Sequence, residues 1–280
     1  MRHAMIECLL SASQTPTLPL PLAQMSIDRS SILLAIPVFN EAATIESVLN
    51  RVQSYARDVL VIDDGSTDAT AGLLARHPIE VIRHSENRGY GRSMQEIIRY
   101  ADANTYAWVI TMDCDEQHEP KQIPDFVHAI EHLSADVISG SRYLAEDHRD
   151  DPAPEQRRRV NMNMTAELND RLQLDLTDAF CGFKAYRVAA VRTLHLSVDG
   201  YDFPMQFWVQ AVANGLRIRE IPVQRIYKDL NRSFGAELDD PERRLNLYRE
   251  TMHREIRHCR HRLATAASRG LECPARHHGA

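Results

Sequence analysis

Residues 111 to 118 read Thr111-Met112-Asp113-Cys114-Asp115-Glu116-Gln117-His118, and they directly follow an apolar run, residues 106–110, that is typical of a buried strand. Asp113 and Asp115 therefore lie where a strand ends and a loop begins. Because side chains alternate along an extended backbone, the two carboxylates point to the same side and Cys114 points the other way. Two carboxylates in this position suit one divalent cation that keeps open positions for a phosphate. The competing interpretation is a solvated loop after a core strand.

Two earlier segments show the same change from an apolar run to polar residues. Residues 32–36 lead into Pro37-Val38-Phe39-Asn40-Glu41, and residues 59–62 lead into Asp63-Asp64-Gly65-Ser66-Thr67-Asp68. Runs as continuously apolar as these are typical of parallel strands that are covered on both faces. The polar segments then gather at the carboxyl ends of the strands, where ligands of open α/β sheets bind.

A helical pattern follows each of these two strands. After the first strand, apolar residues recur with the spacing of one helix face, at Ile45, Val48, Leu49 and Val52. After the second strand, residues 66–68 offer N-caps for another helix. The repeated order of strand, polar loop and helix predicts βαβ units and hence an α/β fold.

Six motifs, taken together and in this order, resemble those of the family 2 inverting glycosyltransferases of the GT-A fold. The nearest branch is that of the polyprenol (dolichol) phosphate mannose synthases, and the resemblance covers about residues 32 to 235. It implies a mixed, mainly parallel sheet flanked by helices on both faces. It also implies transfer of a hexose from a nucleoside-diphosphate sugar, with GDP-mannose the first choice and UDP-glucose the second. The motifs are Ile36-Pro37-Val38-Phe39-Asn40-Glu41, Asp63-Asp64-Gly65-Ser66, Gly89-Tyr90-Gly91, Asp113-Cys114-Asp115-Glu116-Gln117-His118, Gly140-Ser141-Arg142-Tyr143 and Gly182-Phe183-Lys184-Ala185-Tyr186.

The resemblance also assigns residues to the nucleoside end of the donor. Pro37, Phe39 and Glu41 would line the base and the ribose, as their counterparts do in the family. Asp63 and Asp64 would accept hydrogen bonds from the base or the ribose. The structural alternative for residues 63–66 is a turn with an N-cap.

The diphosphate needs its growing negative charge neutralised as it leaves. Asp113 and Asp115, with Gln117 as a further oxygen ligand, would hold Mg²⁺ or Mn²⁺ for this purpose. Arg142 follows a predicted strand, residues 136–139, and resembles the family arginine that reaches the substrate phosphates. Asp113, Asp115 and Arg142 are therefore the catalytic candidates.

Basic residues cluster in two further segments. Arg157, Arg158 and Arg159 open a predicted helix, where positive charge opposes the helix dipole. This local cost indicates an anionic ligand for the cluster, with an exposed charged helix face as the alternative interpretation. A second group resembles the basic motif that closes over the phosphates in the family, and it consists of Lys228, Arg232 and Ser233.

An inverting transfer to a hydroxyl group needs a carboxylate as general base. Gln206 stands where polyprenol-phosphate synthases often have Glu. A phosphate acceptor is already an anion and needs no base, so this absence favours a polyprenyl phosphate. Asp178 and Asp202 remain candidate bases, and Phe180-Cys181 stands where the family has Thr-Ser near the acceptor. A glycosyltransferase with a soluble hydroxyl acceptor therefore stays open.

Two other function classes share parts of this pattern. A nucleotide-sugar-binding protein without turnover would keep the same fold and the same donor site. A sugar nucleotidyltransferase also uses a cation and aspartates, but it needs a Gly-rich, basic loop after the first strand. Asn40-Glu41-Ala42-Ala43 is not such a loop.

The composition is that of a globular domain, with 44% apolar and 26% charged residues among 280. Five cysteines without Cys-x-x-Cys spacing predict a reducing compartment, with no disulfide framework and no zinc site. No apolar run reaches the roughly 18 residues that span a bilayer. We therefore expect a cytoplasmic protein, with peripheral contact to a membrane as the open question.

The last part of the chain is basic. Residues 241–280 carry a formal charge of +5, while residues 1–240 carry −11. An apolar stripe with helical spacing starts at Leu245 and predicts a helix that packs on the domain; the alternative is an amphipathic helix on an anionic membrane. No nucleic-acid partner is expected, because aromatic residues are not interleaved with the arginines. The sequence divides into a flexible N-terminal extension (1–30), a GT-A domain (31–240) and a basic C-terminal helix and tail (241–280).

Overall fold

The computed structural model describes residue 28 and residues 31–145, 150–228 and 238–271. Expectations for the N-terminal extension up to residue 27, for Arg232 and Ser233, and for the tail after residue 271 therefore lie outside the described residues. No helix in the described ranges is long and apolar enough to cross a membrane.

Strands and helices alternate along most of the described chain, as expected for an α/β fold. In chain order the elements are β1 (Ile32–Val38), α1 (Ile45–Val52), β2 (Asp58–Asp63), α2 (Thr70–Leu74), β3 (Glu80–Arg83), α3 (Tyr90–Ala103), β4 (Trp108–Thr111), η2 (Pro120–Gln122), α4 (Ile123–His132), β5 (Val137–Ser141), α5 (Glu155–Leu172), β6 (Lys184–Arg187), α6 (Val188–Val191), α7 (Phe203–Ala213), β7 (Ile218–Pro222), α8 (Pro241–Cys259), η3 (Arg260–Arg262) and η4 (Thr265–Ser268).

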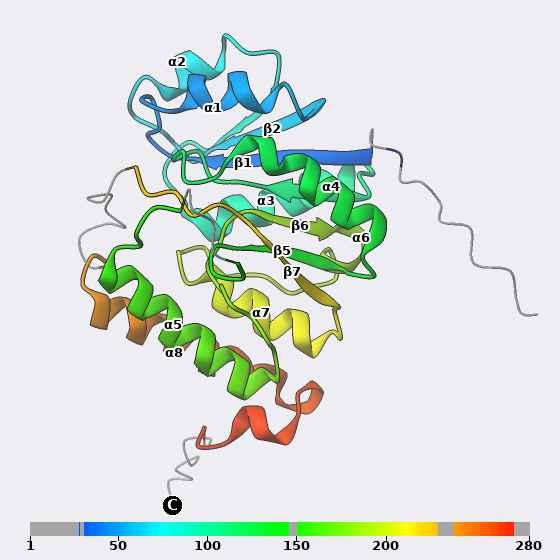
Figure 1. The fold of residues 1–280 in the computed structure, drawn as a ribbon, viewed down its shortest axis with the longest axis vertical. Coiled ribbons are helices and arrows are strands. Elements are labelled where there is room, and N and C mark those ends of the chain that lie inside the picture. The colour runs from blue at the N-terminus through cyan, green and yellow to red at the C-terminus, as the bar shows by residue number, and fades with distance from the viewer. Residues whose placement is uncertain (1–27, 29–30, 146–149, 229–237, 272–280) are drawn as a thin grey trace, which may run out of the picture.

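The strands form one mixed sheet in the order β3-β2-β1-β4-β6-β5-β7 (Figure 1). The pairs β1–β2, β1–β4, β2–β3 and β5–β7 are parallel, and only β6 runs against its neighbours β4 and β5. The expectation of a mixed, mainly parallel sheet with helices on both faces is confirmed. The parallel strands β1, β2 and β4 end at one edge, and the polar motifs that follow them meet there.

The hydrophobic core has two halves, one on each face of the sheet. Side chains of β1 alternate between them, so Leu33 and Ala35 enter one half while Leu34 and Ile36 enter the other. Helices α1, α2 and α4 cover the second half, and α3, α5, α6, α7 and α8 cover the first. Each fully buried aliphatic side chain contributes about 1.5–3 kcal/mol to folding. Burial on both faces therefore holds the strands in place, and with them the polar segments at their ends.

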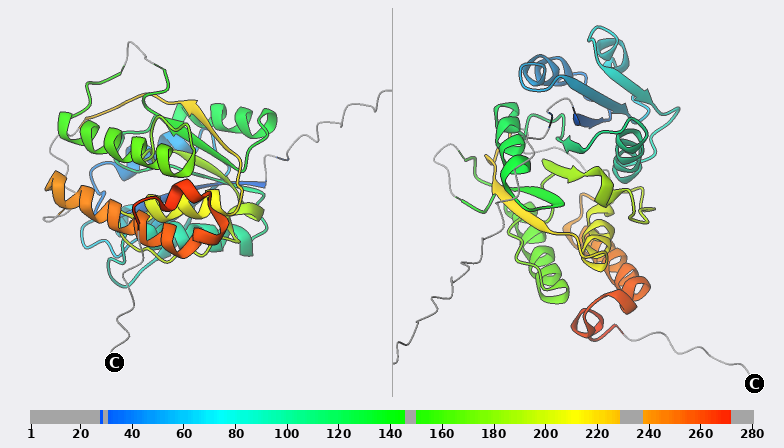
Figure 2. Two further views of the ribbon diagram at one scale, coloured as in Figure 1. Left: turned by 90° about the horizontal axis from the view of Figure 1, so that it is seen from below. Right: turned by 90° about the vertical axis from the view of Figure 1, so that its right-hand side faces the viewer.

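Helix α8 packs into the same core half as α3, α5 and α7. It begins where the sequence predicts, because the Asp240 carboxylate accepts hydrogen bonds from the Glu242 and Arg243 amides at 2.8 and 2.9 Å. Its apolar stripe is covered, and Met252 and Ile256 are fully buried against α7 and α5. Figure 2 shows α5 and α8 beside each other in both views. The stripe is therefore not open to a membrane; the domain limits given above stay a prediction.

Candidate active site

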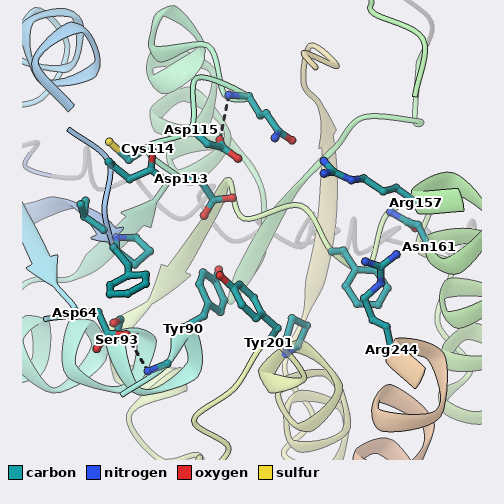
Figure 3. A pocket seen from close by; sticks show the side chains of 18 of the residues that line it. Asp64, Tyr90, Ser93, Asp113, Cys114, Asp115, Arg157, Asn161, Tyr201 and Arg244 are labelled. Carbon is teal, nitrogen blue, oxygen red and sulfur yellow. Dashed lines mark hydrogen bonds between the residues drawn. The ribbon is translucent and has the colours of Figure 1, made fainter. Parts of the chain in front are cut away.

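A cleft opens at the carboxyl ends of β1, β2 and β4 and continues to α5 and α8 (Figure 3). One part of its lining comes from the motifs after β1, β2 and β4 and from the start of α3. The other part comes from α5 and α8, from the segments that follow β5 and β7, from the segment before β6, and from the start of α7 with the loop before it. Its lining includes most of the sequence-predicted residues, namely Pro37, Phe39, Glu41, Asp64, Asp113, Asp115, Gln117 and Arg142.

The two neighbouring aspartates at the end of β2 have different surroundings. Asp64 lines the cleft, and its carboxylate accepts hydrogen bonds from the amides of Arg88 and Gly89 at 2.9 and 2.8 Å. It also lies 2.6 Å from His84 Nδ1. Asp63 is fully buried, lies outside the lining, and accepts a hydrogen bond from the Ser66 amide at 2.9 Å. Asp64 thus holds the loop that enters α3, and Asp63 holds its own turn.

The loops after β1 and β2 are tied together by the polar residues of their motifs. The Asn40 amide donates to Ser66 Oγ at 3.0 Å, and the Asn40 side-chain oxygen accepts from the Thr67 amide at 2.8 Å. The Glu41 amide donates to Thr70 Oγ1 at 2.9 Å. Residues 63–66 therefore make the contacts expected of a turn. The carboxylates that line this end of the cleft are those of Glu41 and Asp64.

Asp113 and Asp115 both line the cleft, and so does Cys114 between them, although its side chain is buried. The three residues follow the end of β4 at Thr111, so strand alternation does not separate Cys114 from the two aspartates. The position of Asp113 depends on Gly182, since a Cβ at Gly182 would lie 2.3 Å from Asp113 Oδ2. Two carboxylates that share an accessible cleft are a hard oxygen donor set. The chemistry of this donor set fits a divalent cation, and Gln117 belongs to the same lining.

His118, the last residue of the same motif, is hydrogen-bonded to the backbone of Asp113. The Asp113 amide donates to His118 Nδ1 at 2.9 Å. Burial lowers the pKa of His118 to about 4, so the ring is neutral and carries its proton on Nε2. That nitrogen lies 3.8 Å from Asp113 Oδ2 and 3.8 Å from Cys181 Sγ. This supporting role of His118 was not predicted from the sequence, although its place in the motif was a usable signal.

Arg142 lines the cleft but is engaged by a carboxylate. Its Nε and a second guanidinium nitrogen donate to the two oxygens of Asp178 at 2.6 and 3.0 Å. Burial by itself would raise the pKa of Asp178, but Arg142 lowers it below the ordinary value, and Asn161 also donates to this carboxylate. Asp178 is therefore a fully buried, ion-paired anion and is poorly suited to act as a base.

The other residues considered at the acceptor end also have structural partners. Asp202 accepts a hydrogen bond from Thr251 Oγ1 at 2.6 Å, and it lies outside the cleft lining. Gln206 is buried and accepts hydrogen bonds from the Ser197 and Val198 amides at 2.8 and 2.9 Å. Neither residue belongs to the lining of the cleft.

The arginine cluster at the start of α5 divides among three environments. Arg157 lines the cleft, the guanidinium of Arg158 lies 3.6 Å from the centre of the Tyr143 ring, and Arg159 is exposed. Arg244 of α8 joins Arg157 in the lining although it is only 4% exposed. Burial lowers the pKa of Arg244, and the nearby Arg157 lowers it further. Figure 3 shows both guanidinium groups on the side of the cleft opposite Asp113.

Lys228 lies outside the lining, and its ammonium group donates to Glu116 Oε2 at 2.9 Å. Several cleft residues from separate parts of the chain were not among the residues predicted from the sequence. Tyr90 had a signal, since it stands inside a motif, and Tyr201 follows Gly200 in the segment compared with the family. Tyr143 likewise stands inside a motif, next to Arg142. Cleft residues without a local signal include Ser93, Asn161, Tyr227 and Arg244.

An α/β sheet whose strand ends carry paired aspartates, facing a basic helical wall, has the architecture of a GT-A glycosyltransferase. The model of the family described as Glycosyl transferase family 2 matches residues 34–194, and the chain belongs to this family. The undecaprenyl-phosphate mannosyltransferase of Micrococcus luteus is 28% identical over 212 residues, covering 72% of this chain and 86% of that protein. The polyprenol monophosphomannose synthase of Mycolicibacterium smegmatis is 28% identical over 215 residues, covering 71% and 78%.

Solved structures agree on the fold. Glucosyl-3-phosphoglycerate synthase from Mycobacterium tuberculosis, in complex with Mn²⁺, UDP and phosphoglyceric acid, superimposes with a TM-score of 0.61. The alignment covers 81% of this chain and 78% of that one, at 18% sequence identity. The GT-A fold expected from the sequence is therefore confirmed.

Proposed function

We propose that the chain transfers a hexose from a nucleoside-diphosphate sugar to a polyprenyl phosphate, with inversion at the anomeric carbon and with Mg²⁺ or Mn²⁺ as cofactor. GDP-mannose is the first candidate donor and UDP-glucose the second. The names of the relatives from Micrococcus luteus and Mycolicibacterium smegmatis support the polyprenyl acceptor and mannose.

The observation that carries the proposal is the separation of charge across the cleft. The carboxylates in the described lining, Glu41, Asp64, Asp113 and Asp115, all lie on the side formed by the strand ends. The opposite side, formed by α5 and α8, contributes the cations Arg157 and Arg244 to that lining. An acidic, cation-binding side suits the donor diphosphate, and a basic side suits an anionic acceptor.

The same distribution of charge also bears on whether the cleft offers the acceptor a general base. The described lining contains no carboxylate on the α5 and α8 side, and both earlier candidates for a base, Asp178 and Asp202, are held by structural partners. A phosphate oxygen is nucleophilic without losing a proton, so it needs no base. A hydroxyl acceptor would need one, which makes the soluble-acceptor alternative the weaker one.

A single displacement follows from this arrangement. The acceptor phosphate, held by Arg157 and Arg244, attacks the anomeric carbon from the side opposite the departing diphosphate, and the bond from that carbon to the diphosphate oxygen breaks. When bound, the divalent cation neutralises the charge that develops on that diphosphate. Asp113 and Asp115 hold the cation, and Phe39, Glu41 and Asp64 hold the nucleoside at the other end of the cleft.

The polyprenyl acceptor can be tested by transfer from radiolabelled GDP-mannose and UDP-glucose to undecaprenyl phosphate in detergent with Mg²⁺ or Mn²⁺. We expect label in the organic-extractable product and its loss in excess EDTA. Label that appears only in water-soluble products would contradict the polyprenyl acceptor and leave the glycosyltransferase activity in place. Binding of nucleotide sugar without any release of label would favour the binding protein without turnover.

A further inference from the structure

Two tyrosine rings lie stacked in the cleft between its acidic and basic sides. Tyr90 is the first residue of α3, and Tyr201 lies in the loop before α7. Their ring centroids are 6.0 Å apart and their planes differ by 12°. Both rings line the cleft, and Tyr201 is 41% exposed. In Figure 3 the pair lies below Asp113, between Ser93 and Arg244.

The loop that carries Tyr201 is fixed on the start of α3. The Arg92 amide donates to the Asp199 carbonyl at 3.2 Å, and the Gln95 side chain donates to the Val198 carbonyl at 3.1 Å. The approach is so close that a Cβ at Gly91 would lie 2.1 Å from the Val198 oxygen, and one at Gly89 would lie 2.3 Å from the Asp199 oxygen. The glycines of the Gly-Tyr-Gly motif therefore allow this contact.

The other side of the loop is fixed by α7 and α8. Gln206 of α7 accepts hydrogen bonds from two loop amides, and its own amide donates to Glu255 of α8 at 3.0 Å. Phe203 packs edge-on against Tyr90, with centroids 6.3 Å apart. Three helices thus hold the ring pair in one position, and such preorganisation lowers the entropy lost when a ligand binds.

The face of α3 that carries Tyr90 has a second feature that points to a ligand. Ser93, one turn further along, lines the cleft and is 1% exposed. Its hydroxyl group has no hydrogen-bond partner among the described residues. A buried hydroxyl in this condition costs roughly 1–3 kcal/mol, and a polar ligand in the cleft would remove that cost.

The position of the rings relative to Asp113 determines which part of the ligand they contact. Figure 3 shows the Tyr90 and Tyr201 rings next to Asp113, at the end of the cleft proposed to bind the cation. In the proposed reaction the hexose is bonded directly to the phosphate held at that end. Pyranose rings present an apolar C–H face, which stacks on aromatic rings.

We propose that Tyr201, stacked on Tyr90, forms the platform that binds the transferred hexose through its C–H face. This inference rests on the proposed function for the position of the donor. A polyprenyl chain is the competing ligand for an exposed aromatic ring, but polar and charged groups such as Ser93 and Asp113 surround this pair, which favours the sugar.

Calorimetric titration of GDP, GDP-mannose, UDP and UDP-glucose with Mn²⁺ separates the sugar from the nucleotide. For the donor that the wild-type chain binds, Tyr201→Leu should weaken binding of the nucleotide sugar about tenfold (about 1.4 kcal/mol) and leave the nucleoside diphosphate unchanged. Tyr201→Phe, which keeps the aromatic ring, should bind the nucleotide sugar as tightly as the wild type does. Tyr55→Leu changes a similarly exposed tyrosine (45%) outside the cleft lining and should have no effect.

Two results would overturn the platform and leave the proposed function intact. One is an equal loss for nucleoside diphosphate and nucleotide sugar in Tyr201→Leu. The other is unchanged binding of both together with a raised KM for undecaprenyl phosphate. If the wild-type chain binds none of the four nucleotides, the proposed function itself fails and the platform fails with it.

Discussion

At Gly182 the absence of a side chain leaves room for the carboxylate of Asp113. Gly182→Ala should displace that carboxylate, because the new Cβ would lie 2.3 Å from Oδ2. We expect at least a tenfold loss of transfer activity, of the order seen when one electrostatic group moves out of place. The matched control is Gly72→Ala, where no atom lies within 4 Å of the new Cβ; activity should stay and stability should rise by about 0.5–1 kcal/mol. Equal activity in the two variants would contradict this role.

Asp113 and Asp115 are the residues on which cation binding depends in the proposed reaction. Replacing either by Asn removes one ligand charge beside the departing diphosphate, so kcat should fall by about 10²-fold or more. Both side chains are partly exposed in the cleft, so the melting temperature should change little. Mn²⁺ titration calorimetry in the presence of nucleoside diphosphate gives a readout apart from activity, and Asp170→Asn, on the exposed surface of α5, is the control. Unchanged Mn²⁺ affinity in both variants would remove the metal assignment.

At the scale of the element, the start of α5 presents neighbouring arginines to different surroundings. Arg157 lines the cleft and Arg159 is exposed. Arg157→Gln should raise the KM for undecaprenyl phosphate by about tenfold, the value of roughly one charge-assisted hydrogen bond. Arg159→Gln should leave the KM within about twofold. Steady-state kinetics in detergent, without a bilayer, at fixed nucleotide sugar measures both, and the reverse order would assign the acceptor to the outer face of the helix.

The elements near the strand ends were predictable because their signals are local. Apolar runs ending in polar motifs gave β1, β2 and β4, and the 3.6-residue stripe gave α1. Two results depend on contacts between distant segments and have no local signal. The sequence placed Arg142 at the phosphates, but only the fold brings Asp178 to its guanidinium. Likewise, Arg244 reaches the cleft because α8 packs on α5 and α7.

At the scale of the whole molecule, Asp136 connects three strands. Its carboxylate accepts hydrogen bonds from Nε of Arg187, the last residue of β6, at 2.7 Å and from the amide of Arg217, just before β7, at 2.9 Å. Hydrogen bonds from Arg217 lower the pKa of Asp136 below its ordinary value. A lowered folded-state pKa means that the contribution is fully present above the unfolded pKa of about 3.9 and is lost as the pH falls below it.

Asp136→Asn should therefore lower the free energy of unfolding by about 2 kcal/mol at pH 7, the value of a few hydrogen bonds to a charged group. The difference from wild type should shrink below about pH 4, where the wild-type carboxylate starts to protonate in the unfolded chain. Urea titrations between pH 3 and pH 7 measure it, with Asp170→Asn as the control. A difference that stays constant down to pH 3 would show that the charge of Asp136 contributes nothing to stability.

The proposed acceptor resides in a membrane, so the molecule must meet a membrane surface. Because α8 packs on the domain, its apolar stripe is not available for contact with a membrane. The candidates for that contact are therefore exposed apolar residues on other elements. Met162 of α5 is 52% exposed, and Arg159 lies three residues before it on the same helix face. A cation next to an exposed apolar side chain suits the interface of an anionic bilayer.

We therefore expect salt-sensitive binding to phosphatidylglycerol vesicles, because the attraction between arginine and anionic lipid is screened over about 10 Å at 0.1 M salt. Arg159→Gln should weaken vesicle binding about fivefold, since one cation near the surface is worth about 1 kcal/mol, and Met162→Gln should weaken it as well. The matched control is Leu133→Gln, which changes another exposed apolar residue (39%) at the end of α4. Sedimentation with vesicles measures binding, and unchanged GDP or UDP affinity verifies that the donor end is intact. If Leu133→Gln weakens vesicle binding as much as Met162→Gln does, the contact is not specific to α5, and the acceptor must reach the cleft by another face.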